Sequence, residues 1–395
     1  MNSSINQKKT IALVANTSWS IYNFRLGLLR HLRQKGYRIV VIAPKDAFTS
    51  KIISEGFEYN EIEISNYGTN PFRDLLLIYD LVKLYQKIQP DLIFHYTIKP
   101  NIFGTFAALY CKVPSIIITT GLGHLFEFKN FIVRNITLIL YKLACKYSMQ
   151  TWFLNSNDRD VFVYNNLVAK SKAVLLKSEG IDLEWFKNEY IVAPGSKSEV
   201  KFLFAGRLLR DKGIIEYIEA AKIIKANYPN VVFQILGFID QSNPNSIPYE
   251  YLQLWQEQKL VSYLGETTDV RPYLQDCDAL VFPSFYREGI SRILMEAAAM
   301  ERPIITTENV GCREVVDHRV NGFLCEPKNV VSLVKYIEKF LEMNVQDRDI
   351  MGKLGRRKMY REFNQRLIFS QYEKCIISII GPASQASKSK NYMDK

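Results

Sequence analysis

Two glutamates, Glu288 and Glu296, have seven residues between them in a stretch where their carboxylates could accept hydrogen bonds from the hydroxyls of a ligand. Glu288 follows a short apolar strand at 279–282, and Glu296 falls inside the helix that comes next. Ser291 is predicted to cap this helix, because its hydroxyl can accept a hydrogen bond from an unpaired backbone amide. The start of such a helix offers free N–H groups and a positive dipole end, which favour a phosphate.

This arrangement suits a nucleotide sugar. A carboxylate accepts hydrogen bonds from two neighbouring hydroxyls, so one glutamate can hold a hexose and the other a ribose. The alternative interpretation is that both are ordinary surface glutamates flanking a helix. A short motif is only a hypothesis until its surroundings support it.

Two cations precede this stretch in the second half of the chain. A predicted strand starts at Val200 and ends at Gly206, and Arg207 and Lys212 follow before a helix begins at Gly213. Arginine grips phosphate oxygens in a bidentate manner, and lysine acts as a point charge. The pair therefore predicts a diphosphate clamp, although solvated surface cations would look the same.

The first half of the chain has polar residues after its predicted strands, at 8–15, 91–95 and 115–119. Glycines in the loop after the strand at 115–119 let the backbone approach a ligand closely. A histidine there can position a sugar hydroxyl or help with proton transfer. The alternative is a histidine that only hydrogen-bonds to a nearby carbonyl, and a structural role is likewise the alternative for His95 and Lys99. The candidate residues are Asn16, Ser18, His95, Lys99 and His124.

The elements that must position these residues alternate between near-continuous apolar strands and helices, which indicates parallel sheets covered on both faces. At 395 residues the chain is long enough for two domains. We expect doubly wound parallel-sheet domains at 1–190 and 196–364. A helix at 365–380 is expected to pack back on the first domain, and 382–395 is expected to form a disordered tail.

Composition excludes several classes of protein. The net charge of +11 is spread along the chain without zinc-finger spacing or RNP-like motifs, so nucleic acid is not an expected partner. Six scattered cysteines and four histidines favour a reducing cytoplasm and argue against a histidine-rich metal site. The N-terminus does not resemble a signal peptide, and no apolar run reaches the roughly 18 residues that span a bilayer.

The segment Phe126–Tyr147 is unusual. Aromatic residues crowd its start, and Arg134, Lys142 and Lys146 fall on one arc of a helix. This pattern is typical of a helix that lies on an anionic membrane surface. A helix that covers the sheet would look similar.

Several stretches resemble glycosyltransferase family 4. They are A-G-R-L-L-R-D-K-G at 205–213, C-D-A-L-V-F-P-S-F-Y-R-E-G-I-S-R-I-L-M-E-A-A-A at 277–299, P-I-I-T-T at 303–307 and N-G-F-L-C-E-P at 321–327. The resemblance implies a GT-B fold, in which two Rossmann-like domains face a central cleft and the C-terminal helix crosses back to the first domain. The first half, with N-T-S-W-S-I-Y-N-F-R, I-K-P-N-I-F-G and T-T-G-L-G-H, is similar to bacterial enzymes that extend undecaprenyl-diphosphate-linked glycans, such as N-acetylgalactosaminyltransferases.

The resemblance also implies roles for individual residues. Arg207 and Lys212 would bind the donor diphosphate, Glu288 the sugar and Glu296 the ribose. The remaining donor contacts would come from Gly206, Gly289, Ile290 and Ser291, with His124 as a further catalytic residue. One departure is that E-G-I-S stands where the family commonly has E-G-F-G or E-G-x-P, so Ser291 replaces a small or rigid residue. The acceptor would contact Asn16, Ser18, His95 and Lys99.

The activity that the resemblance implies is transfer of a hexose or N-acetylhexosamine from a UDP-sugar to a polyprenyl-diphosphate-linked saccharide. The reaction would retain the anomeric configuration and would need no metal or cofactor. The expected location is the inner face of the plasma membrane. D-x-D pairs at 158–160, 276–278 and 347–349 are interpreted as solvated or capping aspartates. The alternatives are a sugar-nucleotide 2-epimerase of the same fold, or a non-catalytic scaffold that binds sugar nucleotides.

Overall fold

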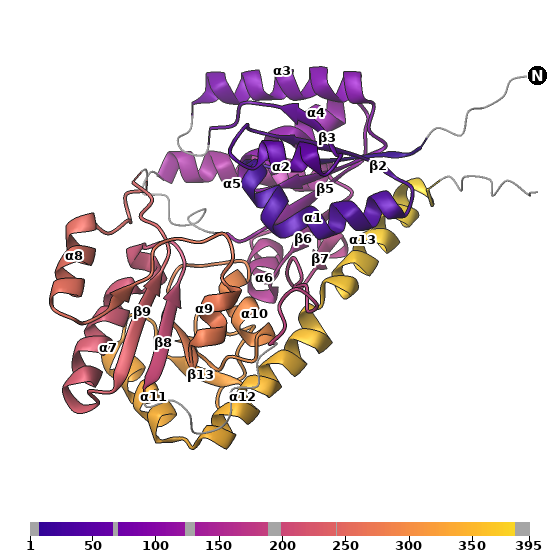
Figure 1. Ribbon diagram of the computed structural model, residues 1–395. Helices are drawn as coiled ribbons and strands as arrows, with labels where there is room; N and C mark the ends of the chain where they lie inside the picture. The colour runs from indigo at the N-terminus through magenta and orange to yellow at the C-terminus, as the bar shows by residue number, and fades with distance from the viewer. Residues whose placement is uncertain (1–7, 66–69, 123–130, 189–198, 242, 384–395) are drawn as a thin grey trace, which may run out of the picture. The chain divides into compact units, whose positions relative to one another are not determined.

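The computed structural model describes residues 8–65, 70–122, 131–188, 199–241 and 243–383, and these form two compact units (Figure 1). Of these residues, unit 1 contains 8–65, 70–120, 131–179 and 368–383, and unit 2 contains 121–122, 180–188, 199–241 and 243–367. The chain thus passes from unit 1 to unit 2 at Glu179–Gly180. The boundary between the two predicted domains, at 190–196, and most of the predicted tail lie outside the described residues.

Unit 1 is built on a sheet of seven strands in the order β3-β2-β1-β4-β5-β6-β7, and every pairing is parallel. The central strands are apolar and completely buried, as expected for a sheet covered on both faces. The strands are β1 (Thr10–Val14), β2 (Arg38–Ala43), β3 (Glu58–Glu61), β4 (Leu92–Tyr96), β5 (Ser115–Thr119), β6 (Gln150–Phe153) and β7 (Ala173–Leu175).

Helices connect these strands. Because crossovers between parallel strands are right-handed, α1 and α2 lie on one face of the sheet, and α3, α4 and α5 lie on the other. The helices are α1 (Ser18–Gln34), α2 (Thr49–Ser54), α3 (Pro71–Ile88), α4 (Thr105–Tyr110, preceded by the π-helical turn Pro100–Gly104), α5 (Phe131–Tyr147) and α6 (Ser156–Tyr164). The part of the predicted surface helix at 126–130 lies outside the described residues.

Unit 2 has a six-stranded parallel sheet in the order β10-β9-β8-β11-β12-β13. Its strands are β8 (Val200–Ala205), β9 (Val231–Leu236), β10 (Ser262–Tyr263), β11 (Ala279–Phe282), β12 (Ile304–Thr307) and β13 (Gly322–Cys325). Its helices are α7 (Ile214–Asn227), α8 (Tyr249–Glu257), α9 (Arg271–Asp276), α10 (Arg292–Ala299), α11 (Val330–Glu342) and α12 (Val345–Lys358).

Both units therefore have the predicted doubly wound α/β fold. In each sheet the strand order reverses once, between β1 and β4 in unit 1 and between β8 and β11 in unit 2. Ligands of such sheets bind outside the carboxyl ends of the strands at this reversal. The loop after β8 carries the predicted clamp, and the loop after β11 carries Glu288 and leads into α10, which carries Glu296.

The last helix, α13 (Gln365–Ile380), belongs to unit 1 from Ile368 onward, as predicted (yellow in Figure 1). Tyr372 is buried and packs on Phe94 and Trp152 of the sheet, with ring centroids 5.1 and 4.9 Å apart. Its hydroxyl lies 3.0 Å from that of Tyr96. Glu373 forms an ion pair with Lys35 at 2.8 Å, which ties α13 to the end of α1.

Replacing Tyr372 should destabilise unit 1. Tyr372→Ala removes a buried ring and should lower the free energy of unfolding by about 3–5 kcal/mol. Tyr372→Phe removes only the hydrogen-bonding partner of the Tyr96 hydroxyl and should cost about 1–2 kcal/mol. Urea unfolding measures the free energies, and hydrogen exchange in β4 and β6 locates the effect.

The control for this prediction is Ile377→Ala, because Ile377 lies on the same helix but is 47% exposed. This change should alter stability by less than about 0.5 kcal/mol. Equal costs for Tyr372→Ala and Ile377→Ala would show that α13 is not part of the core of unit 1.

Candidate functional site

Glu288 and Lys212 form an ion pair in unit 2, although 75 residues separate them in sequence. Lys212 comes from the loop after β8, and Glu288 comes from the loop after β11. Both side chains are largely buried, with 10% and 13% of their surface exposed. The Ser284 hydroxyl is a further partner, since it donates to Oε1 of Glu288 at 3.3 Å. The structure thus brings together two residues that were predicted to bind a donor.

Hydrogen bonds to neighbouring loops fix the backbone in front of Glu288. The carbonyl of Asp211 accepts from the amides of Phe285 and Tyr286 at 3.0 and 2.9 Å. From the loop after β12, the Asn309 side chain donates to the Tyr286 carbonyl at 2.8 Å, and the Thr307 hydroxyl donates to the carbonyl of Ser284. Loops after three neighbouring strands therefore hold Glu288 in place.

Two glycines make this close packing possible. A Cβ atom on Gly213 would lie 2.2 Å from the carbonyl oxygen of Pro283, and one on Gly311 would lie 2.8 Å from Cβ of Glu288. Both glycines also have positive φ angles, +81° and +87°, which side chains disfavour. Substitution at either position would displace the loop that carries Glu288.

Glu296 lies in the second turn of α10 and pairs with Arg292, whose Nε is 2.9 Å from Oε1 of the glutamate. Nη1 of the same arginine donates to the Gly180 carbonyl at 3.1 Å. Burial raises the pKa of Glu296, and Arg292 partly opposes this shift. Arg292 thus fixes the orientation of a carboxylate that is only 14% exposed.

Ser291 occupies the N-cap position of α10 with extended backbone angles, but its side chain makes no capping hydrogen bond. The predicted hydroxyl cap is therefore wrong, although the helix start was located correctly. The Ser291 amide instead donates to the Gly311 carbonyl at 2.9 Å. This contact holds the N-cap residue on the loop after β12, but it involves a different amide from those that a hydroxyl cap would accept from. The two residues before it, Gly289 and Ile290, lead from Glu288 into this helix.

Arg207 is the most accessible of the predicted donor contacts, with 42% of its side chain exposed. Its ion pair with Asp240 is long, at 3.7 Å. The preceding residue, Gly206, lies directly against Gly237, where a Cβ atom would be 1.8 Å from the Gly206 carbonyl oxygen. This close approach fixes the point at which the chain leaves β8 toward Arg207.

Unit 1 places two of the candidate acceptor contacts in its core. His95 is fully buried, 2.9 Å from the Tyr85 hydroxyl, and burial lowers its pKa to about 3. Ser18 is also fully buried, and its hydroxyl donates to the Pro44 carbonyl at 2.8 Å. Burial argues against a role for either side chain in acceptor binding. Their acceptor-binding role was predicted because they lie near the carboxyl ends of β1 and β4, but both side chains belong to the core.

The other two candidates in unit 1 are partly accessible. Asn16 is half-buried directly after β1. Lys99 is half-buried and forms a 2.9 Å ion pair with Asp74 of α3. The predicted catalytic residue His124 lies outside the described residues.

Two functional candidates were missed at the level of sequence. Arg292 is one, although the spacing of an arginine and a glutamate four residues apart in a predicted helix is a recognisable signal. Ser284 is the other, and no sequence signal identifies it. Its contact with Glu288 depends on how the loop turns after β11.

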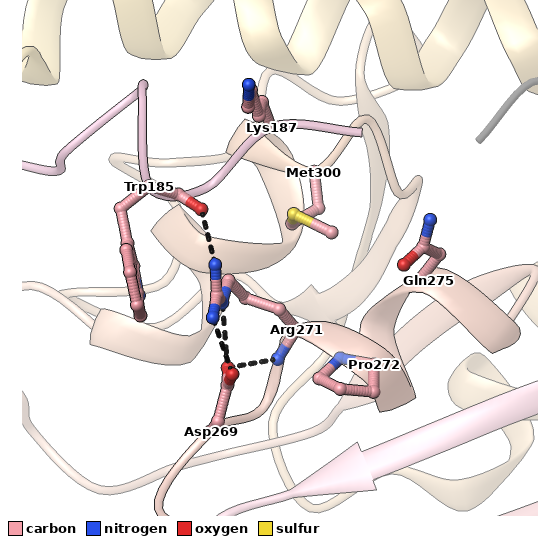
Figure 2. Close-up of a pocket in the computed structure, with 7 residues that line it drawn as sticks. All are labelled: Trp185, Lys187, Asp269, Arg271, Pro272, Gln275 and Met300. Carbon is pink, nitrogen blue, oxygen red and sulfur yellow. Dashed lines mark hydrogen bonds and ion pairs between the residues drawn. The ribbon is translucent and has the colours of Figure 1, made fainter. Parts of the chain in front are cut away.

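A separate pocket of unit 2 contains none of the predicted site residues (Figure 2). The guanidinium of Arg271 stacks 3.5 Å above the Trp185 ring and pairs with Asp269 at 2.6 Å. These contacts fix the loop before α9, so we assign the pocket a structural role. Its lining is Trp185, Lys187, Asp269, Arg271, Pro272, Gln275 and Met300.

In the described part of the chain, no group of three or more His, Cys, Asp or Glu residues is arranged to hold a metal ion. Members of the D-x-D pairs serve caps and ion pairs instead. The Asp158 amide donates to the side chain of the cap residue Asn155 at 2.7 Å. Asp276 pairs with Lys201 at 2.9 Å, and Asp349 pairs with Lys353 at 2.6 Å. Among the same residues, no helix has both the length and the apolar character needed to cross a membrane.

Neutralising Glu296 should stabilise the unliganded protein in a pH-dependent way. Because folding raises its pKa, the contribution of Glu296 to stability is complete below the unfolded pKa and is lost as pH rises through the folded pKa. Glu296→Gln keeps an acceptor for Arg292 without the buried charge. Urea unfolding should show the variant to be more stable than wild type at pH 8, with the difference shrinking toward pH 4. A difference that does not change with pH would contradict this prediction.

Comparison with known proteins relates both halves of the chain to glycosyltransferases. Residues 187–358 match the family model described as glycosyl transferases group 1, and residues 10–155 match the one described as glycosyl transferase 4-like.

Two curated relatives cover most of the chain. The N,N'-diacetylbacillosaminyl-diphospho-undecaprenol alpha-1,3-N-acetylgalactosaminyltransferase of Campylobacter jejuni is 30% identical over 84% of this chain and 89% of its own. The UDP-Gal:alpha-D-GlcNAc-diphosphoundecaprenol alpha-1,3-galactosyltransferase of Escherichia coli is 28% identical over 74% of this chain and 76% of its own.

Solved structures share the fold. A glycosyltransferase from Rickettsia africae superposes with a TM-score of 0.76 at 16% identity, covering 94% of this chain and 99% of its own. Anabaena Alr3699/HepE, solved in complex with UDP and glucose, superposes with a TM-score of 0.74 at 19% identity, covering 94% of this chain and 100% of its own. From the matched domains, the 30% identical relative and the two parallel-sheet units of GT-B type, we conclude that this chain belongs to the group 1 glycosyltransferases.

Proposed function

We propose that this protein transfers a hexose or N-acetylhexosamine from a UDP-sugar to a saccharide carried on polyprenyl diphosphate. The observation that carries the donor half of this proposal is the Lys212–Glu288 pair at the carboxyl ends of β8 and β11. It joins a cation suited to a diphosphate with a carboxylate suited to sugar hydroxyls, at the point where the strand order of unit 2 reverses.

The donor would exchange these contacts for its own. Arg207, which is exposed, and Lys212 would bind the diphosphate, with Gly206, Gly289, Ile290 and Ser291 as further donor contacts. Glu288 would then accept from sugar hydroxyls while Ser284 keeps its carboxylate in position. Glu296, held by Arg292, would accept from the two ribose hydroxyls.

The chemical step we propose is metal-independent and retains the anomeric configuration. The bond between the anomeric carbon and the leaving phosphate oxygen breaks, and the acceptor oxygen bonds to the same face of that carbon. The acceptor proton passes to an oxygen of the departing UDP. Arg207 and Lys212 stabilise the charge that develops on this diphosphate, and His124 would contact the donor sugar. No enzymatic nucleophile is required.

The acceptor half of the proposal rests on the relatives. The Campylobacter and Escherichia enzymes are named for diphosphoundecaprenol-linked saccharides, and the second is also named for UDP-Gal. Since a polyprenyl chain lies in the bilayer, the enzyme would work at the cytoplasmic membrane surface, where α5 would contact anionic lipid. Asn16 and Lys99 remain the proposed acceptor contacts in unit 1.

The other functions considered for this sequence receive less support. An epimerase would need acid and base carboxylates at the strand ends of unit 1, and the loops 16–20 and 97–101 contain none. A non-catalytic scaffold would not need Lys212, Glu288, Glu296 and Arg207 together at one edge of a sheet.

Calorimetric titration with UDP tests the proposed clamp. Wild type should bind UDP in the presence of a chelator, and Arg207→Ala should bind it about 10–100-fold more weakly, since a charged hydrogen bond contributes about 1.5–3 kcal/mol. Arg210→Ala is the matched control, because Arg210 is an exposed arginine on the same loop and should leave affinity unchanged. Binding that requires a divalent ion, or that prefers GDP, would contradict the proposed donor chemistry.

Substitutions of the two glutamates should have different effects on UDP binding and on sugar transfer. Glu288→Gln should leave UDP affinity within about threefold of wild type and reduce sugar transfer at least 100-fold, because its partner is the sugar and its charge matters in the transition state. Glu296→Ala should weaken UDP binding itself about tenfold or more, because the ribose loses its acceptor. Calorimetry and UDP release with acceptor separate the two effects. Equal UDP affinity in wild type and Glu296→Ala would refute the ribose assignment.

A further inference from the structure

Helix α5 exposes an apolar stripe on unit 1. Ile132, Ile136, Ile139 and Leu143 recur at intervals of three and four residues, so they lie on one face of the helix. Between 39% and 67% of each side chain is exposed. The opposite face, with Tyr141, Ala144 and Cys145, is buried against unit 1. The sheet is therefore already covered by the inner face, and the outer stripe has no role in that core.

Helix α3 repeats the pattern, which the sequence analysis did not identify. Its exposed apolar residues are Phe72, Leu75, Leu76 and Tyr79, with exposures between 55% and 81%. Its inner residues Leu77, Leu81, Tyr85 and Ile88 are buried. At the end of α4, Leu109 and Tyr110 are also exposed, at 47% and 70%.

These three helices form one layer on the same face of the sheet. α4 contacts both α3 and α5, and the π-helical turn before α4 also touches both. Figure 1 shows α3 along the outer edge of unit 1 with α4 beside it. The outer surface of this layer, defined here as the α3–α5 surface, therefore carries apolar side chains from three consecutive helices.

Charge on the α3–α5 surface is mainly positive. α5 has no acidic residue, and its Lys142 and Lys146 are exposed. Lys112 is exposed just after α4, and Lys83 and Lys87 are exposed on the last turns of α3. Of the two aspartates on α3, Asp74 is paired with Lys99, and Asp80 is exposed. Extended apolar surface usually marks an interaction site, and a cationic surround favours an anionic occupant.

We propose that the α3–α5 surface docks as a unit on an anionic lipid bilayer, with α3 contributing as much as α5. Its aliphatic and aromatic side chains would enter the headgroup region, and its lysines would contact lipid phosphates. The choice of a bilayer rests in part on the proposed lipid-linked acceptor. The contribution of α3 rests on its own exposed residues.

Vesicle flotation of the full-length protein tests the proposal. Wild type should float with vesicles of phosphatidylglycerol and phosphatidylcholine and much less with phosphatidylcholine alone. The α3 variant Leu75→Gln/Leu76→Gln/Tyr79→Gln and the α5 variant Ile136→Gln/Ile139→Gln should each lose at least tenfold in binding. The replaced side chains are exposed, so both variants should keep the wild-type unfolding transition.

Two matched controls carry single exposed apolar residues elsewhere. Ile53→Gln lies on α2, which covers the other face of the sheet, and Val331→Gln lies on α11 of unit 2; their side chains are 53% and 77% exposed. Both should float like wild type. Ile53→Gln/Trp19→Gln, which removes two exposed apolar side chains from unit 1 away from α3–α5, should also float like wild type.

A water-soluble acceptor with a short lipid chain separates this proposal from the proposed function. Both surface variants should transfer sugar to it at the wild-type rate while losing transfer to acceptor in vesicles. Wild type that transfers nothing but still floats would refute the proposed function and leave the docking surface intact. The docking proposal is overturned if wild type does not float, if the α3 variant floats normally, or if the surface instead mediates a dimer that the α3 variant dissociates.

Discussion

The candidate site depends on one ion pair, between Lys212 and Glu288, that joins the loops after β8 and β11. These strands are neighbours in the sheet, at the position where the strand order reverses. A largely buried charge is costly unless it is paired, so each residue requires the other in the unliganded protein. Gly213 and Gly311 let the surrounding loops approach closely enough for the pair to form.

The buried carboxylate of Glu296 likewise lowers the stability of the unliganded protein. Glu296 carries a carboxylate into surroundings that raise its pKa, and only Arg292 compensates for this. An uncharged side chain there would suit the fold better. The charge is consistent with a site that is completed by its ligand, whose hydroxyls would replace the missing hydration. Arg292 also donates to the Gly180 carbonyl, so the second glutamate is linked to the point where the chain passes from unit 1 into unit 2.

Unit 1 uses its helical layer in two ways. The inner faces of α3 and α5 complete the core, and their outer faces present apolar and basic residues to the surroundings. The polar residues at its strand ends are less informative. His95 and Ser18 looked like candidate ligand contacts, yet both hydrogen-bond inside the core. Polar residues after strands therefore indicate the functional edge of a sheet without showing which side chains face outward.

The sequence by itself determined the fold class, most strands, α13 and the membership of a glycosyltransferase family. Strands β5 and β11 were predicted with their observed bounds, because apolar runs and helix periodicity are local signals. The short strands β3, β6 and β7 were not predicted. For β3 the reason is that its sequence, E-Y-N-E, has no apolar run, and it is a strand through its pairing with β2. Tertiary structure alone decided that Lys212 meets Glu288, that Ser291 forgoes its cap and that His95 is buried. These outcomes depend on contacts between residues distant in sequence, which no local pattern records.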